Sequence, residues 1–261
     1  MVGEVLFRQL PMPPRSAPLV SCIMPTRDRR EHARNAISYF VRQRYPLKEL
    51  VILDDGIDRI ADIVTGQPGV RYVALDRDVP LGVKRNIACD IAEGELIAHL
   101  DDDDWYSPDH LTNIVAALAQ RSTDICGTNA PRFLNPEEQI AYCFRWTATR
   151  RLWLAGCSLG YRKSLWKQTP FPAVPFAEDT AFVWNSAANR AGPGCRVDII
   201  TNASVVGIIH RRNTVPKQAR GPYWRQIPIA VVARQMGRDF ERYIRTRPDP
   251  IPVAREDRCH R

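Results

Sequence analysis

Short apolar runs alternate along this chain with longer segments in which apolar residues recur every three or four positions. Four of these runs are predicted to be buried strands: residues 19–24, 50–53, 70–75 and 96–100. Amphipathic helices are predicted at residues 31–43, 82–93 and 180–189, and a further strand at residues 205–209. Strands that alternate with helices predict an α/β fold, in which a mostly parallel sheet is flanked by helices in a single domain.

The two ends of the chain lack hydrophobic periodicity. Residues 1–18 are predicted to form a proline-rich arm, and residues 247–261 a tail. Residues 19–225 would form the domain, followed by a C-terminal helix at residues 226–246. Four arginines share one face of that helix: Arg234, Arg238, Arg242 and Arg245. Two interpretations remain open, because this basic amphipathic helix either docks on the domain or contacts an anionic membrane.

Composition excludes several classes of protein. With 44% hydrophobic and 25% charged residues, the chain is neither disordered nor fibrous. A net charge of +8 favours anionic partners, but there is no RNA-binding signature or zinc-finger spacing, so nucleic acid is not expected as a partner. The sequence contains no membrane-spanning run and no signal-like start, and its seven cysteines are scattered. We therefore expect a cytoplasmic protein with reduced thiols, and peripheral contact with the inner membrane face stays open.

Polar turns follow three of the predicted strands, at residues 25–28, 54–56 and 101–104. Ligands of parallel sheets bind beyond the carboxyl ends of the strands, so we expect these turns to line one site. The third turn is a run of four aspartates, each repelling the next by about 1 kcal/mol or more, and a divalent cation would offset this repulsion. Alternatively, the run caps the helix that follows Pro108 or is solvated, although the adjacent Trp105 and Tyr106 favour a site.

If strand geometry continues through the acidic run, alternate carboxylates point to opposite sides. Asp101 and Asp103 would then share one side, and Asp102 and Asp104 the other. Only one of the two pairs needs to face a metal ion.

Several segments resemble the family 2 glycosyltransferases of the GT-A fold, in the order in which that family has them: residues 20–26, 49–56, 82–86 and 93–104. The resemblance runs from about residue 19 to residue 214. It implies a GT-A, Rossmann-like domain whose residues 19–104 bind the nucleotide and whose residues 105–225 bind the acceptor. It also implies inverting transfer of a sugar from a nucleoside diphosphate sugar, with a UDP-sugar as the expected donor and Mn²⁺ or Mg²⁺ as cofactor. The acceptor would be a hydroxyl of a glycan, a lipid-linked molecule or another compound.

The resemblance also assigns residues on the donor side. The nucleotide-sugar site would comprise Pro25, Thr26, Arg27, Asp55, Lys84, Arg85, Asp101 and Asp102. The metal would be bound by Asp103, the last aspartate of the DXD motif, with Asp101 and His210. The family often has an aromatic residue where this chain has Arg27, so the donor base is left open. Lys84 and Arg85 begin a predicted helix, where they either face the diphosphate or form an exposed turn.

On the acceptor side, Asp179 matches the family's general base, which removes the proton of the acceptor hydroxyl. The alternative is that Glu178 and Asp179 only favour the amino end of the helix that follows. By the same resemblance, the acceptor site would comprise Trp153, Gly156, Ser158 and Glu178. His99 lies inside a predicted strand and is expected in the core.

Two other functions remain open. One is a nucleotidyltransferase that makes nucleotide sugars, although the turn at residues 25–28 lacks the glycine-rich phosphate loop that such an enzyme normally has. The other is a module that holds a divalent metal at the acidic run without catalysis.

Overall fold

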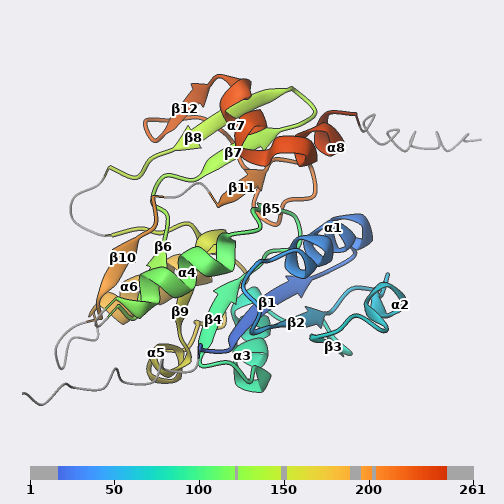
Figure 1. Ribbon diagram of the computed structural model, residues 1–261, viewed down its shortest axis with the longest axis vertical. Helices are drawn as coiled ribbons and strands as arrows, with labels where there is room; N and C mark the ends of the chain where they lie inside the picture. The colour runs from blue at the N-terminus through green and yellow to red at the C-terminus, as the bar shows by residue number, and fades with distance from the viewer. Residues whose placement is uncertain (1–16, 121–122, 148–151, 189–194, 202–203, 246–261) are drawn as a thin grey trace, which may run out of the picture.

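The computed structural model of this protein describes residues 17–120, 123–147, 152–188, 195–201 and 204–245. Its larger sheet has the strand order β10-β6-β9-β4-β1-β2-β3 (Figure 1). The four predicted strands form one parallel block of this sheet: β1 (Val20–Thr26), β2 (Lys48–Asp54), β3 (Val70–Ala74) and β4 (Leu96–His99). The short strands β6 (Ile125–Gly127), β9 (Gly160–Arg162) and β10 (Val197–Ile199) extend it, with β9 antiparallel to its neighbours.

Helices cover both faces of this sheet, which is why its strands are apolar on both sides. The even-numbered side chains of β1 pack in one core with α1 (Arg30–Val41) and α4 (His110–Ala119). Ile23, which points the other way, packs in a second core with α3 (Leu81–Ile91), α5 (Lys163–Gln168) and α6 (Glu178–Ala188). A short helix, α2 (Ala61–Val64), precedes β3. The predicted helices at residues 31–43, 82–93 and 180–189 are thereby confirmed to within a few residues.

A second sheet of five strands was not predicted. Its order is β12-β8-β7-β11-β5, and β11 (Val205–Ile208) is the one strand of it that the hydrophobic pattern indicated. The others are β5 (Trp105–Tyr106), β7 (Arg132–Asn135), β8 (Ile140–Phe144) and β12 (Trp224–Ile227). The predicted domain boundary at residue 225 falls inside β12, which pairs with β8.

The C-terminal helix is not continuous, contrary to the prediction. It divides into α7 (Ile229–Met236), the 3-10 turn η2 (Gly237–Asp239) and α8 (Phe240–Arg245). Gly237 causes the break, because its φ of 58° lies in the left-handed region that glycine adopts easily. The indole N–H of Trp105 donates to Asp239 Oδ2 at 2.8 Å, and α7 packs on β7 and β8. The segment is therefore docked on the domain.

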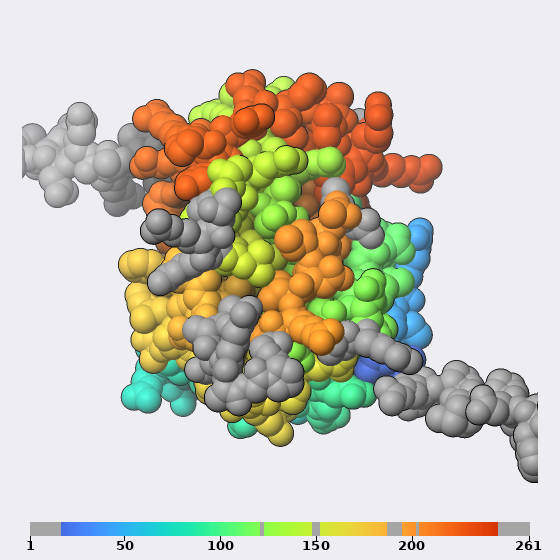
Figure 2. All heavy atoms as spheres, turned by 90° about the vertical axis from the view of Figure 1, so that its left-hand side faces the viewer, coloured from blue at the N-terminus to red at the C-terminus, as the bar shows by residue number. Residues whose placement is uncertain are grey.

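The last segments of the domain, from β12 to α8, gather at one end of the molecule, drawn in deep orange to red at the top of Figure 2. Arg234 and Arg238 are exposed there, as is Arg242, while the side chain of Arg245 lies outside the description. The arm at residues 1–16 and the tail at residues 246–261 also lie outside the described residues. Among the described helices, none is long and apolar enough to cross a membrane.

Six cysteines lie in the described part of the chain, and five of them are free thiols there: Cys22, Cys89, Cys126, Cys143 and Cys157. Burial raises the pKa of Cys89 and Cys126 to about 12, so these thiols are inert. That all seven cysteines are reduced stays a prediction, and Cys259 lies outside the described residues.

Candidate active site

Polar turns from neighbouring strands meet at one edge of the larger sheet. β1 and β4 lie side by side and run in parallel, so the segments that follow them are adjacent. The hydroxyl of Thr26 donates a hydrogen bond to Asp102 Oδ2 at 2.7 Å. The structure therefore joins two of the three turns directly, as parallel topology led us to expect.

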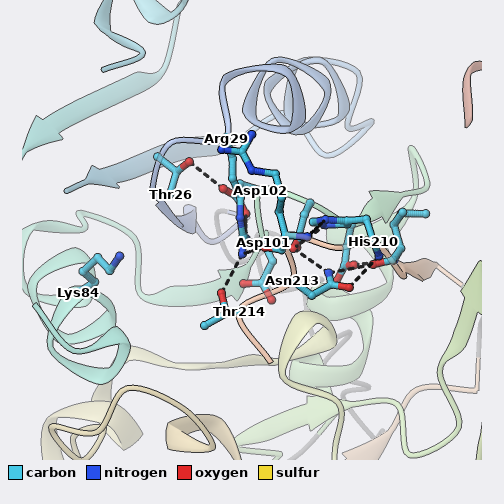
Figure 3. A network of polar contacts seen from close by, with 12 residues as sticks. Thr26, Arg29, Lys84, Asp101, Asp102, His210, Asn213 and Thr214 are labelled. Atoms are coloured by element: carbon cyan, nitrogen blue, oxygen red, sulfur yellow. Dashed lines mark hydrogen bonds and ion pairs between the residues drawn. The ribbon is translucent and has the colours of Figure 1, made fainter. Parts of the chain in front are cut away.

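A side chain that sequence analysis did not select, Arg29, holds the acidic turn together (Figure 3). Its Nη1 donates to Asp102 Oδ1 at 2.9 Å and to Asp103 Oδ2 at 3.0 Å. Its Nη2 donates to the carbonyl of Arg212 at 2.5 Å and to Thr214 Oγ1 at 2.9 Å. No signal in the sequence separates Arg29 from Arg27 and Arg30, because only the fold shows which guanidinium points inward.

Asp103 also accepts bonds from the segment after β11. Its Oδ2 lies 3.1 Å from His210 Nε2 and 3.1 Å from Asn213 Nδ2. Burial favours the neutral carboxyl, but the hydrogen bond from His210 and the charges of Lys217 and Arg29 outweigh it, so the pKa of Asp103 is lowered. Asp103 is thus held ionised beside His210, as the metal-site hypothesis requires. Asn213 was not foreseen.

Burial alternates along the acidic run, although residues 101–104 form a turn after β4. Asp102 and Asp104 are each 3% exposed, while Asp101 and Asp103 are more open. Burial raises the pKa of Asp102 to about 7 and that of Asp104 to about 6. Asp104 accepts the backbone N–H of Ile208 at 2.9 Å.

The acidic run does not cap the helix that follows it. The residue at the amino end of α4 is Asp109, and it makes no side-chain cap. The two aromatics after the run are buried, and the Tyr106 hydroxyl accepts the N–H of Asp101 at 2.8 Å. These aromatics therefore anchor the acidic turn between the two sheets.

Two adjoining cavities open at this edge. The first, of about 370 Å³, is lined by the acidic run and also by Glu178 and Asp179. The second, of about 530 Å³, is lined by Thr26, Arg27 and Lys84 among others. Four residues line both cavities: Pro25, Arg29, Leu81 and Thr214. Carboxylates from distant parts of the chain thus face one connected space.

Lys84 and Arg85 are both buried, so they are not an exposed helix turn. Lys84 Nζ donates to Asp55 Oδ1 at 2.7 Å, and the Asp55 side chain is fully covered. Asp55 does not itself line either cavity, but it accepts bonds from Lys84 and from the N–H of Val79, at 3.3 Å, and both of these residues line the second cavity. Arg27, at the rim, pairs with Asp78 at 2.5 Å.

Arg85 connects the acidic turn with the start of α6. Its Nε donates to Glu178 Oε1 at 2.8 Å, and its Nη2 donates to Asp101 Oδ1 at 3.0 Å. Asp179, next to Glu178, lies against Gly156, and Trp153 lines the same cavity. Burial, followed by the charge of Glu178, raises the pKa of Asp179 to about 6.

Ser158, predicted in the acceptor site, makes its side-chain hydrogen bonds within the protein. Its hydroxyl donates to the carbonyl of Ala155 at 2.7 Å and accepts the N–H of Thr128 at 2.9 Å. Both bonds stabilise the turn η1 (Gly156–Ser158), and the side chain lies outside the first cavity. His99, as predicted, is a core residue, with Nδ1 2.8 Å from the carbonyl oxygen of Gly156.

The donor atoms present suit a cation that takes further ligands from a substrate. In the described part of the chain, no three His, Cys, Asp or Glu side chains are grouped so that they could hold a metal by themselves. Asp103 and His210 offer one carboxylate oxygen and one imidazole nitrogen 3.1 Å apart. Mn²⁺ accepts both kinds of ligand, whereas Mg²⁺ prefers oxygen. These residues therefore fit a partial metal site.

Comparison with known proteins gives similar relatives over part of the chain. WcaA of Escherichia coli strain K12, named as a colanic acid biosynthesis glycosyl transferase, is 33% identical over 114 residues, 42% of this chain and 41% of WcaA. TuaG of Bacillus subtilis strain 168, named as a teichuronic acid biosynthesis glycosyltransferase, is 27% identical over 140 residues, 48% of this chain and 56% of TuaG. The matches thus span about half the length of these relatives.

Solved structures share the fold at low sequence identity. TarS of S. aureus (residues 1–349) has a TM-score of 0.58 and 19% identity, with 73% of this chain and 60% of that chain covered. The mannosyltransferase PcManGT of Pyrobaculum calidifontis, solved with GDP-Man and Mn²⁺, has a TM-score of 0.60 and 20% identity, with 77% and 60% covered. The predicted α/β, GT-A architecture is confirmed by these likenesses.

The family model of glycosyl transferase family 2 matches residues 21–171, more than half of the chain. The matched region contains the acidic turn, Arg29 and Arg85, and it ends before Asp179. This chain therefore belongs to glycosyl transferase family 2.

Proposed function

We propose that this protein transfers a sugar from a nucleoside diphosphate sugar to an acceptor hydroxyl, by a metal-dependent displacement that inverts the anomeric centre. The observation that carries the proposal is that Asp103 and Asp179, 76 positions apart in the sequence, line one cavity. A second cavity, with Lys84 and Arg27 in its wall, adjoins the first. One space can thus hold an anionic donor beside a carboxylate base.

On the donor side, the second cavity takes the nucleotide and the junction of the two cavities takes the diphosphate. Lys84, Arg27 and Arg29 line the second cavity and provide positive charge for the phosphates. The nucleotide sugars in solved relatives support this assignment, since TarS was solved with UDP-GlcNAc and PcManGT with GDP-Man. We expect a UDP-sugar as donor.

Asp103 and His210 would hold Mn²⁺ or Mg²⁺ at the junction, with Asp101 close by. When bound, such a cation neutralises the charge of the leaving diphosphate as a Lewis acid. The Mn²⁺ in the PcManGT structure supports this cofactor. Arg29, which contacts both Asp102 and Asp103, keeps the acidic turn folded around its carboxylates.

Asp179 would act as the general base. The acceptor oxygen forms the new bond to the anomeric carbon as its proton passes to an Asp179 oxygen. The bond between sugar and phosphate breaks, and its electron pair leaves with the nucleoside diphosphate. With a pKa of about 6, Asp179 is ionised at neutral pH and is a stronger base than an exposed aspartate.

A glycan is the acceptor that the relatives favour, because WcaA and TuaG are named for the biosynthesis of polysaccharides. Trp153, Phe133 and Phe176 line the first cavity and offer aromatic faces on which sugar rings stack. A lipid-linked glycan fits equally. The exposed Arg234 and Arg238 would then meet anionic lipid on the cytoplasmic face of a membrane.

The test is donor binding by calorimetry, with UDP-GlcNAc and GDP-mannose each titrated in Mn²⁺ and in EDTA. We expect a donor to bind the native protein only with the metal, and Asp103→Asn to lose this binding. Asp109→Asn is a matched control, because Asp109 pairs with Arg44 at the surface. Near-normal metal-dependent binding by a folded Asp103→Asn would remove Asp103 from the proposal.

A further inference from the structure

An uncommon backbone conformation precedes the carboxylate of Asp179. Ala177, immediately before α6, has a φ of 59°, in the left-handed region that residues with a Cβ disfavour. Ala177 lines the first cavity, and its carbonyl accepts the N–H of Ala181 at 3.1 Å. Such strain persists only where surrounding contacts maintain it. The turn into α6 is therefore held by its neighbours.

One of those neighbours is Gly156, from the 3-10 turn η1. A Cβ added there would lie 1.9 Å from Asp179 Oδ2 and 3.1 Å from Asp179 Cβ, so the carboxylate occupies the space that a side chain would fill. The carbonyl of Gly156 is fixed by His99 of β4, at 2.8 Å from its Nδ1. One side of the Asp179 carboxylate is thus set by the sheet.

The other neighbour is the buried bridge of Arg85. Its guanidinium donates to Glu178 at 2.8 Å and to Asp101 at 3.0 Å, and the side chains of Arg85 and Glu178 are 4% and 3% exposed. Arg85 belongs to α3, Glu178 to α6, and Asp101 to the acidic turn. A single cation therefore connects three elements. Its Nη1 makes no further hydrogen bond among the described residues, so its side-chain hydrogen bonds there go to these two carboxylates.

We propose that Arg85 is a positioning residue for Asp179, which it orients by holding the adjacent Glu178 against the acidic turn. The left-handed turn at Ala177 leads into α6, and the Asp179 carboxylate occupies the space beside Gly156 that a side chain would fill. The inference rests on the proposed function, in which Asp179 is the base. It adds that the geometry of the base depends on the acidic turn of the donor side.

The charged groups that face Asp179 are few. Glu178 precedes it on α6, Arg85 faces it from α3, and Asp101 faces it from the acidic turn, while Gly156 adds no charge. The two acids raise its pKa and Arg85 lowers it, after the larger effect of burial. Glu178→Gln keeps the shape of the side chain but removes a negative charge. Arg85→Lys keeps the positive charge but removes the two-carboxylate bridge.

The first test needs no substrate. The carboxyl carbon of Asp179 is followed by NMR as pH is varied, in the full native chain and in both variants. We expect Glu178→Gln to move the midpoint to lower pH and Arg85→Lys to leave it nearly unchanged. An unchanged midpoint in a folded Glu178→Gln protein would overturn the proposal, because the carboxylate of Glu178 would not be held close enough to Asp179 to affect its charge.

The second test measures donor hydrolysis, with water as acceptor and Mn²⁺ present, on UDP-GlcNAc or GDP-mannose. Arg85→Lys should lower kcat by roughly tenfold or more with little change in donor KM, since misplacing a catalytic group has that effect. In the Glu178→Gln background the same substitution should have little further effect, because both act through one contact. Additive losses would show that Arg85 does not act through Glu178.

A third variant tests the same role in case the Arg85 and Glu178 variants do not fold. Ala177→Gly keeps every side-chain contact and suits a positive φ, so the protein should remain folded while the turn loosens and kcat falls roughly tenfold. Gln139→Gly is the matched control, because Gln139 also has a positive φ, of 55°, but lies exposed between β7 and β8. Equal kcat in Ala177→Gly and Gln139→Gly would contradict the positioning role of this turn.

Two outcomes separate the role of Asp179 as base from the role of Arg85 in positioning it. If Asp179→Asn keeps native turnover, the base lies elsewhere and the proposed function is wrong in that respect. If Asp179→Asn loses turnover while Arg85→Lys and Ala177→Gly retain native kcat, the base stands and only the positioning inference falls.

Discussion

The acidic turn and the start of α6 both place adjacent carboxylates at the first cavity, but their charged surroundings differ. Arg29 reaches Asp102 and Asp103, and the half-buried Lys217 lies 4.0 Å from Asp104. At the start of α6, Glu178 pairs with Arg85, the one cation in contact among the described residues, and shares it with Asp101. One aspartate, Asp103, is therefore held ionised, while the other, Asp179, has its pKa raised to about 6.

This difference in pKa indicates which chemistry each region can perform. A carboxylate that stays charged can bind a cation, because protons do not compete with the cation for its oxygens near neutral pH. A carboxyl with a pKa nearer to neutrality is suited to accept and release a proton. The same residue type thus serves two roles because of its neighbours, so a substitution in one region should leave the role of the other intact.

The largest expected effect is at α6. Asp179→Asn removes the proton acceptor, so turnover should fall by about 10² or more while donor affinity is kept. The measurement is kcat for donor consumption beside calorimetric donor binding, with Asp109→Asn as the surface control. Unchanged turnover would assign the base to another group.

The next largest effect is expected from Arg29, the positively charged side chain that contacts the acidic turn. Arg29→Met leaves the carboxylates of Asp102 and Asp103 without their shared partner, so the free energy of unfolding should fall by about 3 kcal/mol. Mn²⁺ should restore part of that loss, because an ion that binds only the folded state stabilises it. Urea titrations with and without Mn²⁺ measure both effects.

Arg30→Met is the control for that experiment. Arg30 pairs with Asp58 and Asp62 at the surface, where ion pairs contribute little, so the loss should be much smaller. Equal losses in the Arg29 and Arg30 variants would contradict the special role of the acidic turn.

A smaller effect is expected from the turn beside Asp179. Gly156→Ala places a methyl group where the carboxylate lies, so kcat should fall roughly tenfold while donor binding to the acidic turn is kept. Ser158→Ala, in the same 3-10 turn, should lower the melting temperature through its lost hydrogen bonds but keep turnover. If Ser158→Ala lost turnover as Gly156→Ala does, the turn would matter only for folding.

The smallest effect is expected when the pH is varied and turnover of the native protein is measured. Because Asp179 must be ionised to accept a proton and its pKa is raised, turnover should be constant above neutral pH and about half-maximal near pH 6. Below that pH it should decline further, while the ionised Asp103 still supports donor binding. A profile that stays flat down to pH 5 would argue that no group with the raised pKa of Asp179 controls the rate.

Much of the first half of the domain was predictable from its sequence. Residues 19–24 and 96–100 are apolar on both sides, and that pattern belongs to strands covered by helices on two faces. The acidic turn was found because it follows such a strand. The second sheet was missed because β5 has two residues and the other short strands lack a clear alternation.

The site was predictable in outline but not in its contacts. Asp103 and Asp179 were identified by their place in motifs, and the structure puts both at one cavity. Asp55 and Ser158 were assigned to the site by motif, and the structure adds contacts that no motif gives: Asp55 accepts a bond from Lys84, and Ser158 donates to the carbonyl of Ala155. A motif gives the type of residue at a position, whereas burial depends on segments that arrive from elsewhere in the chain.

The sequence by itself determined the parallel block of strands, the turns at their carboxyl ends and the acids that those turns carry, because hydrophobic periodicity and turn chemistry are local properties. Only the tertiary structure decided that Arg29 holds the acidic turn, that Arg85 joins it to α6, and that the C-terminal helix breaks at Gly237. Each of these depends on contacts or backbone angles created when distant segments pack together. Hydrogen bonds and charges act over a few ångströms in space, and separation along the chain does not reveal which groups will lie that close.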